Sequence, residues 1–422
     1  MAVICIPSRS QGGLTLPLAC AKTGVRHSPP CRRGAADDGA FSRTLAAFLM
    51  LDPTVPGRRR VPGSPGPDRE TPTDPTRRGV EMTGTETGTE VLTDSSPRLS
   101  SSGVRRAQQR LAGQVTRTPV VRFEELDRLA GARLWLKAEN LQRGGSFKMR
   151  GALLAVERLV AADSRGVVAQ STGNHAIAIA VAAQECGLPA TLVLPEDAAP
   201  TKVRRIRETG AECLQAGTTL ADRIAVVERL RALRGLDVVD PYQDIDVVLG
   251  QGTATAELVD GVATAGGWLD AVVLPVGGGS AIAGACLVTA GTGIEVIGAE
   301  PDGVPALSEA LRAGEPVTVA ARPTIADGLR PDRIGKLPFD VVRHAVTDVV
   351  RVEEEAIAEA MRTVLTKCRL LVEPAAATAV AAALRVAWRG GRADIGVLLS
   401  GGNVEPSLVA SLLGDEAVPA SA

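Results

Sequence analysis

Aromatic residues are scarce in this chain of 422 residues, since phenylalanine, tryptophan and tyrosine together make up only 2% of it. A core without large rings must be filled by Ala, Val, Leu and Ile, and the hydrophobic content of 45% is sufficient for a sizeable one. The same scarcity leaves few platforms on which single-stranded bases could stack. A formal net charge of −1 also lacks the basic field that nucleic acid or an acidic membrane surface attracts.

Residues that commonly bind metals are also few and scattered. The three histidines, His27, His175 and His344, are far apart in sequence, so we expect no zinc site. The seven cysteines form no CxxC pair, which is typical of reduced thiols in a cytoplasmic protein. The longest apolar runs contain glycine, proline or charged residues, so we expect no membrane-spanning helix.

Residues 1–100 differ from the rest of the chain because they are rich in Pro, Gly, Arg, Ser and Thr. Residues 58–67, for example, combine three arginines with prolines and glycines and cannot bury enough apolar surface to fold. The arginine content would suit organelle targeting, but Asp37, Asp38 and Asp52 oppose it. We therefore expect a disordered tail, or a translation start further along the chain, for example at Met82.

From about Arg105 onward, short apolar runs alternate with amphipathic stretches. This alternation predicts parallel sheets with helices on both faces, an α/β fold. We expect strands at 134–138, 166–170, 190–194, 211–214, 237–239, 269–276, 295–299 and 395–399, and helices at 148–161, 174–185, 201–209, 220–233, 255–263, 281–289, 353–365 and 375–386.

One lysine stands out by its position. Lys148 follows a glycine turn, Gly144-Gly145-Ser146-Phe147, and opens an apolar helix. A lysine that is held inside a fold loses part of its preference for the charged form, so its amine can act as a nucleophile. Most lysines are solvated surface groups, and an assignment therefore depends on segments elsewhere in the chain.

Three turns between a strand and a following segment carry small and polar residues: Ser171-Thr172-Gly173-Asn174-His175, Gly277-Gly278-Gly279-Ser280 and Ser400-Gly401-Gly402-Asn403. Backbone N–H groups at a helix start suit a phosphate in the glycine turn and a carboxylate in the Ser171 turn. In open α/β sheets such turns lie together at the ligand-binding edge. Plain turn geometry and helix capping are the simpler alternatives.

A dinucleotide site is a competing interpretation of the glycine turn. Glu300 ends the next predicted strand, where an acid that binds ribose would lie. The GxGxxG pattern fails, however, because Ile282 stands at the position of its last glycine.

Together with Lys148, these turns resemble the motifs of fold-type-II enzymes that depend on pyridoxal phosphate, above all the threonine dehydratase (threonine ammonia-lyase) and serine racemase family. The resemblance covers about residues 105–413. Its motifs occur in order as Lys137-Ala138-Glu139-Asn140-Leu141-Gln142, Gly145-Ser146-Phe147-Lys148, Ser171-Thr172-Gly173-Asn174-His175, Gly250-Gln251-Gly252-Thr253, Pro275-Val276-Gly277-Gly278-Gly279-Ser280, Ala326-Asp327-Gly328, Val372-Glu373-Pro374 and Ser400-Gly401-Gly402-Asn403.

The resemblance implies an architecture of two open parallel-sheet domains, similar to the β subunit of tryptophan synthase. A large domain that binds pyridoxal 5′-phosphate would comprise residues 101–165 and 249–415, and a small domain would comprise residues 166–248. The cofactor would lie in the cleft between the two domains. The resemblance also implies a homodimer.

The resemblance further implies roles for individual residues. Lys148 would hold the cofactor covalently and remove the α-proton of the substrate, and Thr172 would serve as an acid on the opposite face in a racemase. Phe147 would border the ring, Asn174 would contact its 3′-oxygen and Ser400 its pyridine nitrogen. The phosphate would be bound by Gly277, Gly278, Gly279, Ser280 and Ala281, and the substrate carboxylate by the loop of Ser171, Thr172, Gly173 and His175.

The predicted reaction follows from the hydroxyl at Ser400. Unlike an aspartate, a hydroxyl cannot keep a proton on the pyridine nitrogen, which favours prompt loss of a β-hydroxyl over transamination. Together with this preference, the resemblance to threonine dehydratase implies deamination of L-threonine and L-serine to a 2-oxo acid and ammonia. The alternatives are a serine racemase, a specialised hydroxy-amino-acid dehydratase such as one in hydroxyectoine breakdown, and a non-catalytic nucleotide-binding protein.

A divalent metal accompanies some relatives in this family, and the resemblance places it near Glu300. Here Ala306 stands where a second acidic ligand would be needed. We therefore expect no metal.

Overall fold

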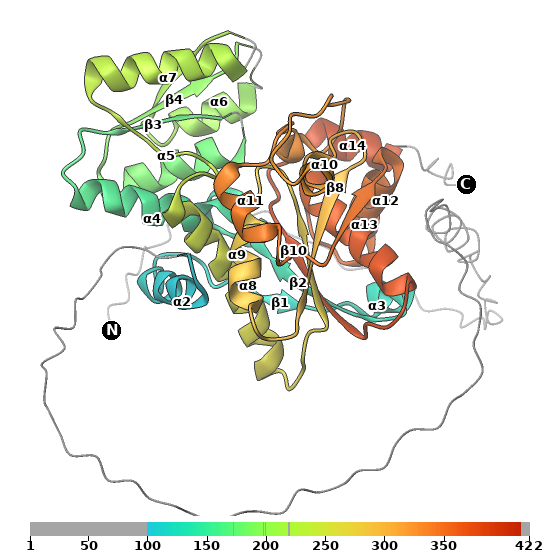
Figure 1. Cartoon of the computed structure of the whole chain (residues 1–422). Coiled ribbons are helices and arrows are strands. Elements are labelled where there is room, and N and C mark those ends of the chain that lie inside the picture. Colours follow the sequence, from blue (N-terminus) through green and yellow to red (C-terminus); the bar gives the residue numbers. More distant parts are fainter. Residues whose placement is uncertain (1–98, 172, 197, 199, 218–219, 415–422) are drawn as a thin grey trace, which may run out of the picture.

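The computed structural model describes residues 99–171, 173–196, 198, 200–217 and 220–414, so the predictions for the N-terminal tail lie outside the described residues. The described strands form two sheets (Figure 1). The larger sheet has the strand order β1-β2-β10-β7-β8-β9 and the smaller one β5-β4-β3-β6. Among these strands β1 runs antiparallel to β2, and all other neighbours are parallel. The predicted α/β fold with two open parallel sheets is confirmed.

The two sheets draw on different parts of the chain. The larger sheet contains β1 (Val120–Val121), β2 (Arg133–Ala138), β7 (Ala271–Pro275), β8 (Glu295–Pro301), β9 (Asp348–Val352) and β10 (Asp394–Leu399). The smaller contains β3 (Val167–Gln170), β4 (Ala190–Leu194), β5 (Glu212–Gln215) and β6 (Asp237–Val238). All strands of the smaller sheet fall within residues 166–248, although the domain boundaries themselves stay a prediction.

Helices cover both sheets, and α5, α6 and α7 pack on the smaller one (Figure 1). None of the described helices is long and apolar enough to cross a membrane. The α-helices are α2 (Ser101–Arg110), α3 (Glu124–Ala130), α4 (Lys148–Ala161), α5 (Asn174–Cys186), α6 (Pro200–Arg207), α7 (Leu220–Arg234), α8 (Ile245–Thr264), α9 (Ser280–Thr289), α10 (Ala306–Ala313), α11 (Lys336–Val342), α12 (Glu354–Lys367), α13 (Pro374–Trp388) and α14 (Pro406–Gly414), with short 3-10 turns η1 (Glu139–Leu141), η2 (Arg143–Gly145) and η3 (Asp327–Leu329).

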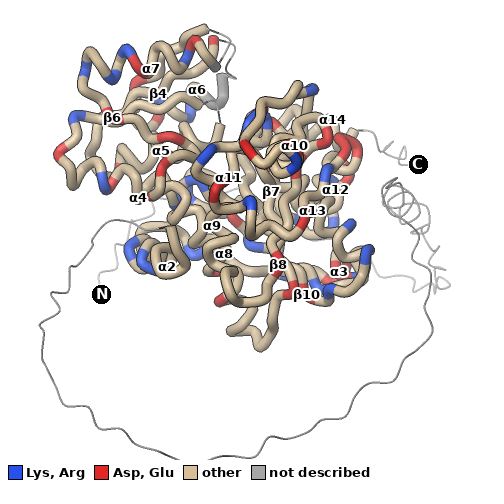
Figure 2. Tube along the Cα trace, viewed as in Figure 1, with Lys and Arg blue, Asp and Glu red and all other residues tan. Residues whose placement is uncertain are grey.

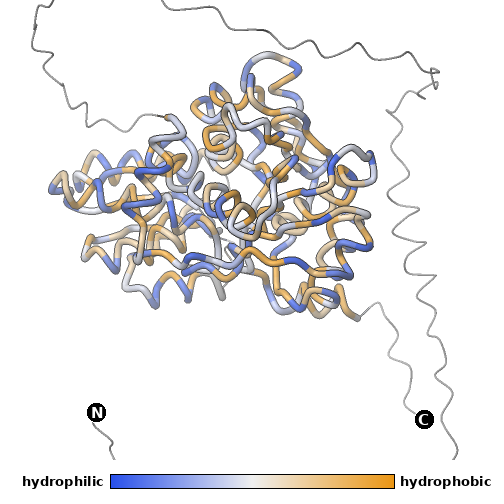
Figure 3. Tube along the Cα trace, turned by 90° about the horizontal axis from the view of Figure 1, so that it is seen from below, coloured by the Kyte–Doolittle hydropathy of each residue, from blue (hydrophilic) through white to orange (hydrophobic). Residues whose placement is uncertain are grey.

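Small aliphatic side chains form the core. The central strands β7 and β10 are buried along their whole length, which explains why they are near-continuous apolar runs rather than alternating ones. Hydrophobic and hydrophilic segments alternate elsewhere along the chain (Figure 3), and charges of both signs are interspersed over the described elements (Figure 2). This distribution agrees with the near-zero net charge of the sequence.

Helix α8 begins at Ile245, ten residues before the predicted start at 255, so the predicted boundary was wrong. Gly250 and Gly252 are poor helix formers in isolation, but they lie where α8 crosses its neighbours. A Cβ on Gly250 would come within 2.5 Å of Gly151 Cα in α4, and a Cβ on Gly284 in α9 would come within 2.5 Å of Gly252 Cα. The glycines let three helices meet backbone to backbone, and this packing outweighs their low propensity. The sequence prediction also omitted β1, β9, α2, α3, α10, α11 and α14.

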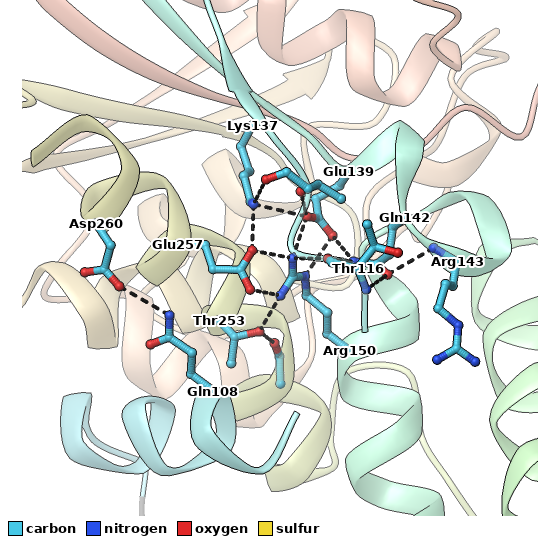
Figure 4. A network of polar contacts seen from close by, with 12 residues as sticks. Gln108, Thr116, Lys137, Glu139, Gln142, Arg143, Arg150, Thr253, Glu257 and Asp260 are labelled. Atoms are coloured by element: carbon cyan, nitrogen blue, oxygen red, sulfur yellow. Dashed lines mark hydrogen bonds and ion pairs between the residues drawn. The ribbon is translucent and has the colours of Figure 1, made fainter. Parts of the chain in front are cut away.

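A buried network of four charges connects the start of α4 to the larger sheet (Figure 4). Arg150 donates to both carboxylate oxygens of Glu139, at 2.8 and 2.7 Å, and to both of Glu257, at 2.8 Å each. Lys137 donates to Glu257 at 2.6 Å and to the carbonyl oxygen of Thr118 at 2.6 Å. All four charged side chains are at most 7% exposed. Two cations and two carboxylates therefore neutralise one another out of contact with water.

We predict that Gly284→Ala destabilises the protein. The methyl group would gain helix propensity of up to about 1 kcal/mol, but it would collide with backbone atoms of α8 that cannot turn aside, and overpacking of this kind costs about 1–3 kcal/mol. Urea unfolding should therefore shift to lower concentration. Gly414→Ala is the control, because a Cβ at that position meets nothing within 4 Å; an unchanged Gly284→Ala midpoint would contradict the close crossing.

We also predict that Arg150→Met lowers the free energy of unfolding by about 3–5 kcal/mol, because it leaves two buried carboxylates with a single cation. Arg110→Met is the matched control. Arg110 also pairs with a glutamate, Glu157, but its side chain is 50% exposed, and a pair of that kind contributes about 0–1 kcal/mol. Equal effects of the two substitutions on thermal unfolding would show that the buried network is not stabilising.

Candidate active site

Lys148 is the first residue of α4. Its Nζ is 3.2 Å from the Ser280 hydroxyl oxygen at the start of α9 and 3.3 Å from the carbonyl oxygen of Pro241, in the segment between β6 and α8. Burial lowers the pKa of the Lys148 amine from 10.5 to about 8, although the negative charges of Asp240 and Glu373 act in the opposite direction. The Phe147 ring lies beside the amine, with its centroid 5.1 Å from Nζ. The structure thus brings together Lys148, Phe147 and Ser280, three of the predicted site residues.

The glycine turn joins β7 to α9 and has no room for side chains. Gly279 has a φ of +97° and caps α9, a conformation that favours glycine. A Cβ on Gly278 would lie 2.0 Å from a ring carbon of Tyr242, and one on Gly277 would lie 3.1 Å from the carbonyl oxygen of Gly328. The turn therefore presents its backbone at the N-terminus of α9, next to Ser280 and Ala281, where a phosphate would be bound.

Ser400 follows the buried strand β10, and its segment pairs with the residues that precede Lys148. The carbonyl oxygen of Ser400 accepts from the Phe147 N–H at 3.0 Å, and the Gly145 carbonyl accepts from the Gly402 N–H at 3.0 Å. Ser400 is 2% exposed, and its hydroxyl has no hydrogen-bond partner among the described residues. Burying a hydroxyl without a hydrogen-bond partner costs free energy. A bound group that accepts from or donates to the Ser400 hydroxyl would explain why it is buried without one.

Asn174, at the start of α5, already has polar partners. Its side-chain amide donates to both carboxylate oxygens of Glu373, at 2.8 and 2.9 Å. Its carbonyl oxygen accepts from Asn403 at 2.7 Å, and Asn403 also donates to the Gly144 carbonyl at 2.8 Å. Asn174 is therefore fixed between the smaller sheet and the Ser400-to-Asn403 turn. The sequence motifs contained Glu373 and Asn403 without indicating this role.

His175 is a buried neutral side chain. Its Nε2 lies 3.0 Å from the carbonyl oxygen of Val239, which can only accept, so Nε2 carries the proton and Nδ1 does not. Burial, followed by the nearby charge of Lys148, lowers the pKa of His175 to about 3. Nδ1 has no hydrogen-bond partner among the described residues. His175 is thus an imidazole without charge at physiological pH.

The turn between β3 and α5 contains the remaining predicted residues. The Ser171 hydroxyl accepts from the Gly173 N–H at 3.2 Å, which is a local turn contact. Thr172 lies outside the described residues, and so does any geometry that would test its predicted role. Because β3 and α5 flank this turn, it lies at the carboxyl edge of the smaller sheet, next to Asn174.

The carboxylate of Glu300, which the resemblance places near a metal in some relatives, forms hydrogen bonds with backbone N–H groups. Its two carboxylate oxygens accept from the N–H groups of Leu307 and Ser308, at 2.9 and 3.1 Å, so Glu300 caps the N-terminus of α10. Burial raises the pKa of this carboxyl despite these hydrogen bonds. In the part of the chain that the structure describes, no three His, Cys, Asp or Glu side chains form a cluster that could hold a metal.

Sequence reasoning missed the segment that covers the glycine turn. Tyr242, the single tyrosine of the chain, packs its ring against Gly278 and Gly335, and burial raises the pKa of its phenol to about 12. Gln243 accepts from the Leu337 N–H at 2.9 Å. The segment directly follows β6, so its place at the carboxyl edge of a parallel sheet was the signal that could have identified it.

The residues fit a pyridoxal phosphate. The glycine turn offers backbone N–H groups without side chains, Lys148 offers an amine that loses its proton more readily than usual, and Ser400 offers an unsatisfied buried hydroxyl. These features lie close together, as the contacts of Phe147 with Ser400 and of Lys148 with Ser280 establish.

We predict that the amine of Lys148 in the cofactor-free protein reacts with an acylating reagent at a rate that is half-maximal near pH 8. Only the neutral amine reacts. With a pKa of about 8, Lys148 becomes neutral at a lower pH than an ordinary lysine, whose pKa is about 10.4. Peptide mapping by mass spectrometry would follow the reaction. In urea the midpoint should return to about 10.4; the same midpoint in folded and unfolded protein would contradict burial of the amine.

Comparison with known proteins agrees with this geometry. Residues 111–401 match the family model described as "Pyridoxal-phosphate dependent enzyme". The L-threo-3-hydroxyaspartate ammonia-lyase of Saccharomyces cerevisiae is 35% identical over 73% of this chain and 94% of its own length. The serine racemase of Arabidopsis thaliana is 36% identical over 72% of this chain and 92% of its own length.

Solved structures give the same result. The serine racemase of maize superimposes with a TM-score of 0.70 at 34% identity and covers 75% of this chain and 97% of its own. The serine racemase of Dictyostelium discoideum has a TM-score of 0.68 at 34% identity and covers 72% and 99%. The glycine turn, the buried amine and these similarities lead to one conclusion: the chain belongs to the family of pyridoxal-phosphate dependent enzymes.

Proposed function

We propose that this protein is an ammonia-lyase that removes the hydroxyl of L-threonine and L-serine by β-elimination and releases a 2-oxo acid and ammonia. The observation that carries the proposal is the buried Lys148 amine, which has a lowered pKa and bonds to Ser280 on the glycine turn. A lysine in this state is suited to abstract a proton next to a carboxylate. The reaction removes the α-hydrogen and the β-hydroxyl as water, and a second water then hydrolyses the resulting imine.

Pyridoxal phosphate, when bound, supplies an electron sink that stabilises negative charge at the substrate's α-carbon. Gly277, Gly278, Gly279, Ser280 and Ala281 would hold its phosphate, Asn174 its 3′-oxygen and Ser400 its pyridine nitrogen, with Phe147 beside the ring. Ser171, Thr172, Gly173 and His175 would bind the carboxylate of the amino acid. His175 would do so as a neutral side chain, so the charge of the carboxylate would be met by backbone N–H groups and the N-terminus of α5.

Each catalytic residue would have a limited task. Lys148 takes the α-proton at Nζ, and its neighbours Ser280 and the Pro241 carbonyl keep that atom in place before the proton arrives. Ser400 contributes a hydroxyl and no charge. Because a neutral hydroxyl does not keep a proton on the pyridine nitrogen, the ring would withdraw electrons from the α-carbon less strongly. Elimination of the β-hydroxyl would then proceed faster than reprotonation or transamination.

Two further functions rest on the named relatives. The ammonia-lyase of Saccharomyces cerevisiae and a Pseudomonas protein that is 37% identical are both named for L-threo-3-hydroxyaspartate, and a substrate with a second carboxylate is therefore a candidate here. The serine racemases among the relatives make inversion of serine a second candidate, with Thr172 as the acid. A specialised substrate such as a hydroxyectoine breakdown product is a third candidate, which rests on the family resemblance alone.

We also propose that the two sheets correspond to two domains, a large one of residues 101–165 and 249–415 and a small one of residues 166–248. Closure of the small domain would exclude water from the site. We propose a homodimer in the cytoplasm as the working assembly, on the likeness to the family.

A substrate panel tests the proposed function. With pyridoxal phosphate present, L-threonine should give 2-oxobutanoate and L-serine should give pyruvate, and Lys148→Ala should abolish both products together with the visible absorbance of the bound cofactor. D-serine formed from L-serine, without much keto acid, would show a racemase instead. A protein that remains colourless would refute the proposal. Loss of absorbance in Lys148→Ala with an unchanged thermal midpoint would exclude misfolding as the cause.

A further inference from the structure

Arg205 connects the two sheets at the candidate site. It lies on α6, which packs beside the smaller sheet, and its guanidinium donates to the side-chain oxygen of Asn403 in the turn that follows β10 of the larger sheet. Asn403 in turn donates to Asn174 at 2.7 Å and to the Gly144 carbonyl at 2.8 Å. The guanidinium is therefore one amide group away from Asn174, which opens the helix behind the predicted carboxylate-binding turn.

The charge of Arg205 has no counter-ion in the described part of the chain. Its one hydrogen bond there is to a neutral amide oxygen, and no ion pair includes it. The neighbouring Arg204 differs, because it pairs with Glu208 at 4.0 Å one turn further along the chain, and its side chain is 72% exposed. A guanidinium has five N–H donors, and the contact with Asn403 uses one of them. Arg205 thus has a positive charge and several donors available beside the site.

Such a group suits a carboxylate. The planar fork of arginine matches a carboxylate with two parallel hydrogen bonds, which gives both affinity and geometric selectivity. L-Threonine and L-serine have a single carboxylate, which the Ser171-to-His175 turn is proposed to bind. A cation close to that turn, one amide group away from Asn174, has no partner in either of them, but it would find one in an amino acid whose side chain also ends in a carboxylate.

We propose that Arg205 binds the second carboxylate of a dicarboxylic 3-hydroxy amino acid and so sets the substrate preference of the site. This inference rests on the proposed ammonia-lyase function and adds to L-threonine and L-serine a substrate class with a second carboxylate. Arg205 acts as a specificity-determining residue and takes no part in moving the α-proton, which is the task of Lys148. The hydroxyl of such a substrate would leave from the carbon next to the carboxylate that Arg205 holds.

The test compares two substrates in the cofactor-loaded enzyme, L-threo-3-hydroxyaspartate and L-threonine. Arg205→Ala should reduce kcat/KM for hydroxyaspartate about 10- to 100-fold more than for threonine, since a hydrogen-bonded charge pair contributes that much. The loss should appear mainly in KM. Arg205→Lys keeps the charge without the fork and should restore part of the preference. Arg204→Ala on the same helix should leave both substrates unaffected.

A binding measurement separates this inference from the proposed reaction. L-Malate has two carboxylates and a hydroxyl but no amine, so it cannot be turned over, and L-lactate has one carboxylate fewer. Calorimetry should show that Arg205→Ala weakens L-malate about 10-fold or more and hardly changes L-lactate, whether or not any amino acid is deaminated. Two results would overturn the proposal and mean that Arg205 only joins the two sheets. One is an equal loss of kcat/KM for hydroxyaspartate and threonine in Arg205→Ala, and the other is unchanged binding of L-malate.

Discussion

The buried set of Lys137, Glu139, Arg150 and Glu257 fixes the position of Lys148 at the start of α4. These side chains come from β2, η1, α4 and α8, and they meet in a space that none of them could occupy alone without a large desolvation cost. Arg150 lies two residues after Lys148 on the same helix, so its four hydrogen bonds to carboxylates orient the first turn of α4. The Lys148 amine can then be held by weak neutral contacts because the helix that carries it is held by strong ones.

Two buried lysines illustrate how partners decide chemistry. Burial lowers the pKa of Lys137 and of Lys148 alike. Lys137 lies between the carboxylates of Glu139 and Glu257, 3.8 and 2.6 Å away, and these favour its charged form. Lys148 has a hydroxyl and a backbone carbonyl as neighbours. The first lysine is suited to hold structure and the second to exchange a proton.

Much of the fold could be predicted from the sequence where one rule dominates. The helix at 148–161 and the strand at 190–194 have the predicted bounds, because in each the apolar pattern is regular and stops near polar, glycine or proline residues. The start of α8 could not be predicted, since Gly250 and Gly252 lower helix propensity and only their fit against Gly151 and Gly284 shows why they belong in a helix. The glycine turn and Lys148 were readable as motifs. Tyr242 and Arg205 were not, because their significance depends on neighbours that are distant in sequence.

The scarcity of aromatic residues has its counterpart in α13, whose buried residues are mostly alanine. Layers that are separated by methyl groups lie close together, as the helix crossings at glycine do. In a core of this kind the side chains are already small, and there is little free space for larger ones. Such a core therefore tolerates smaller side chains better than larger ones. A shorter side chain removes few contacts, whereas one or two additional carbon atoms force the backbones apart. Alanine scanning, the usual way of mapping a core, would pass over this helix almost without effect, and replacements by valine or leucine would reveal it.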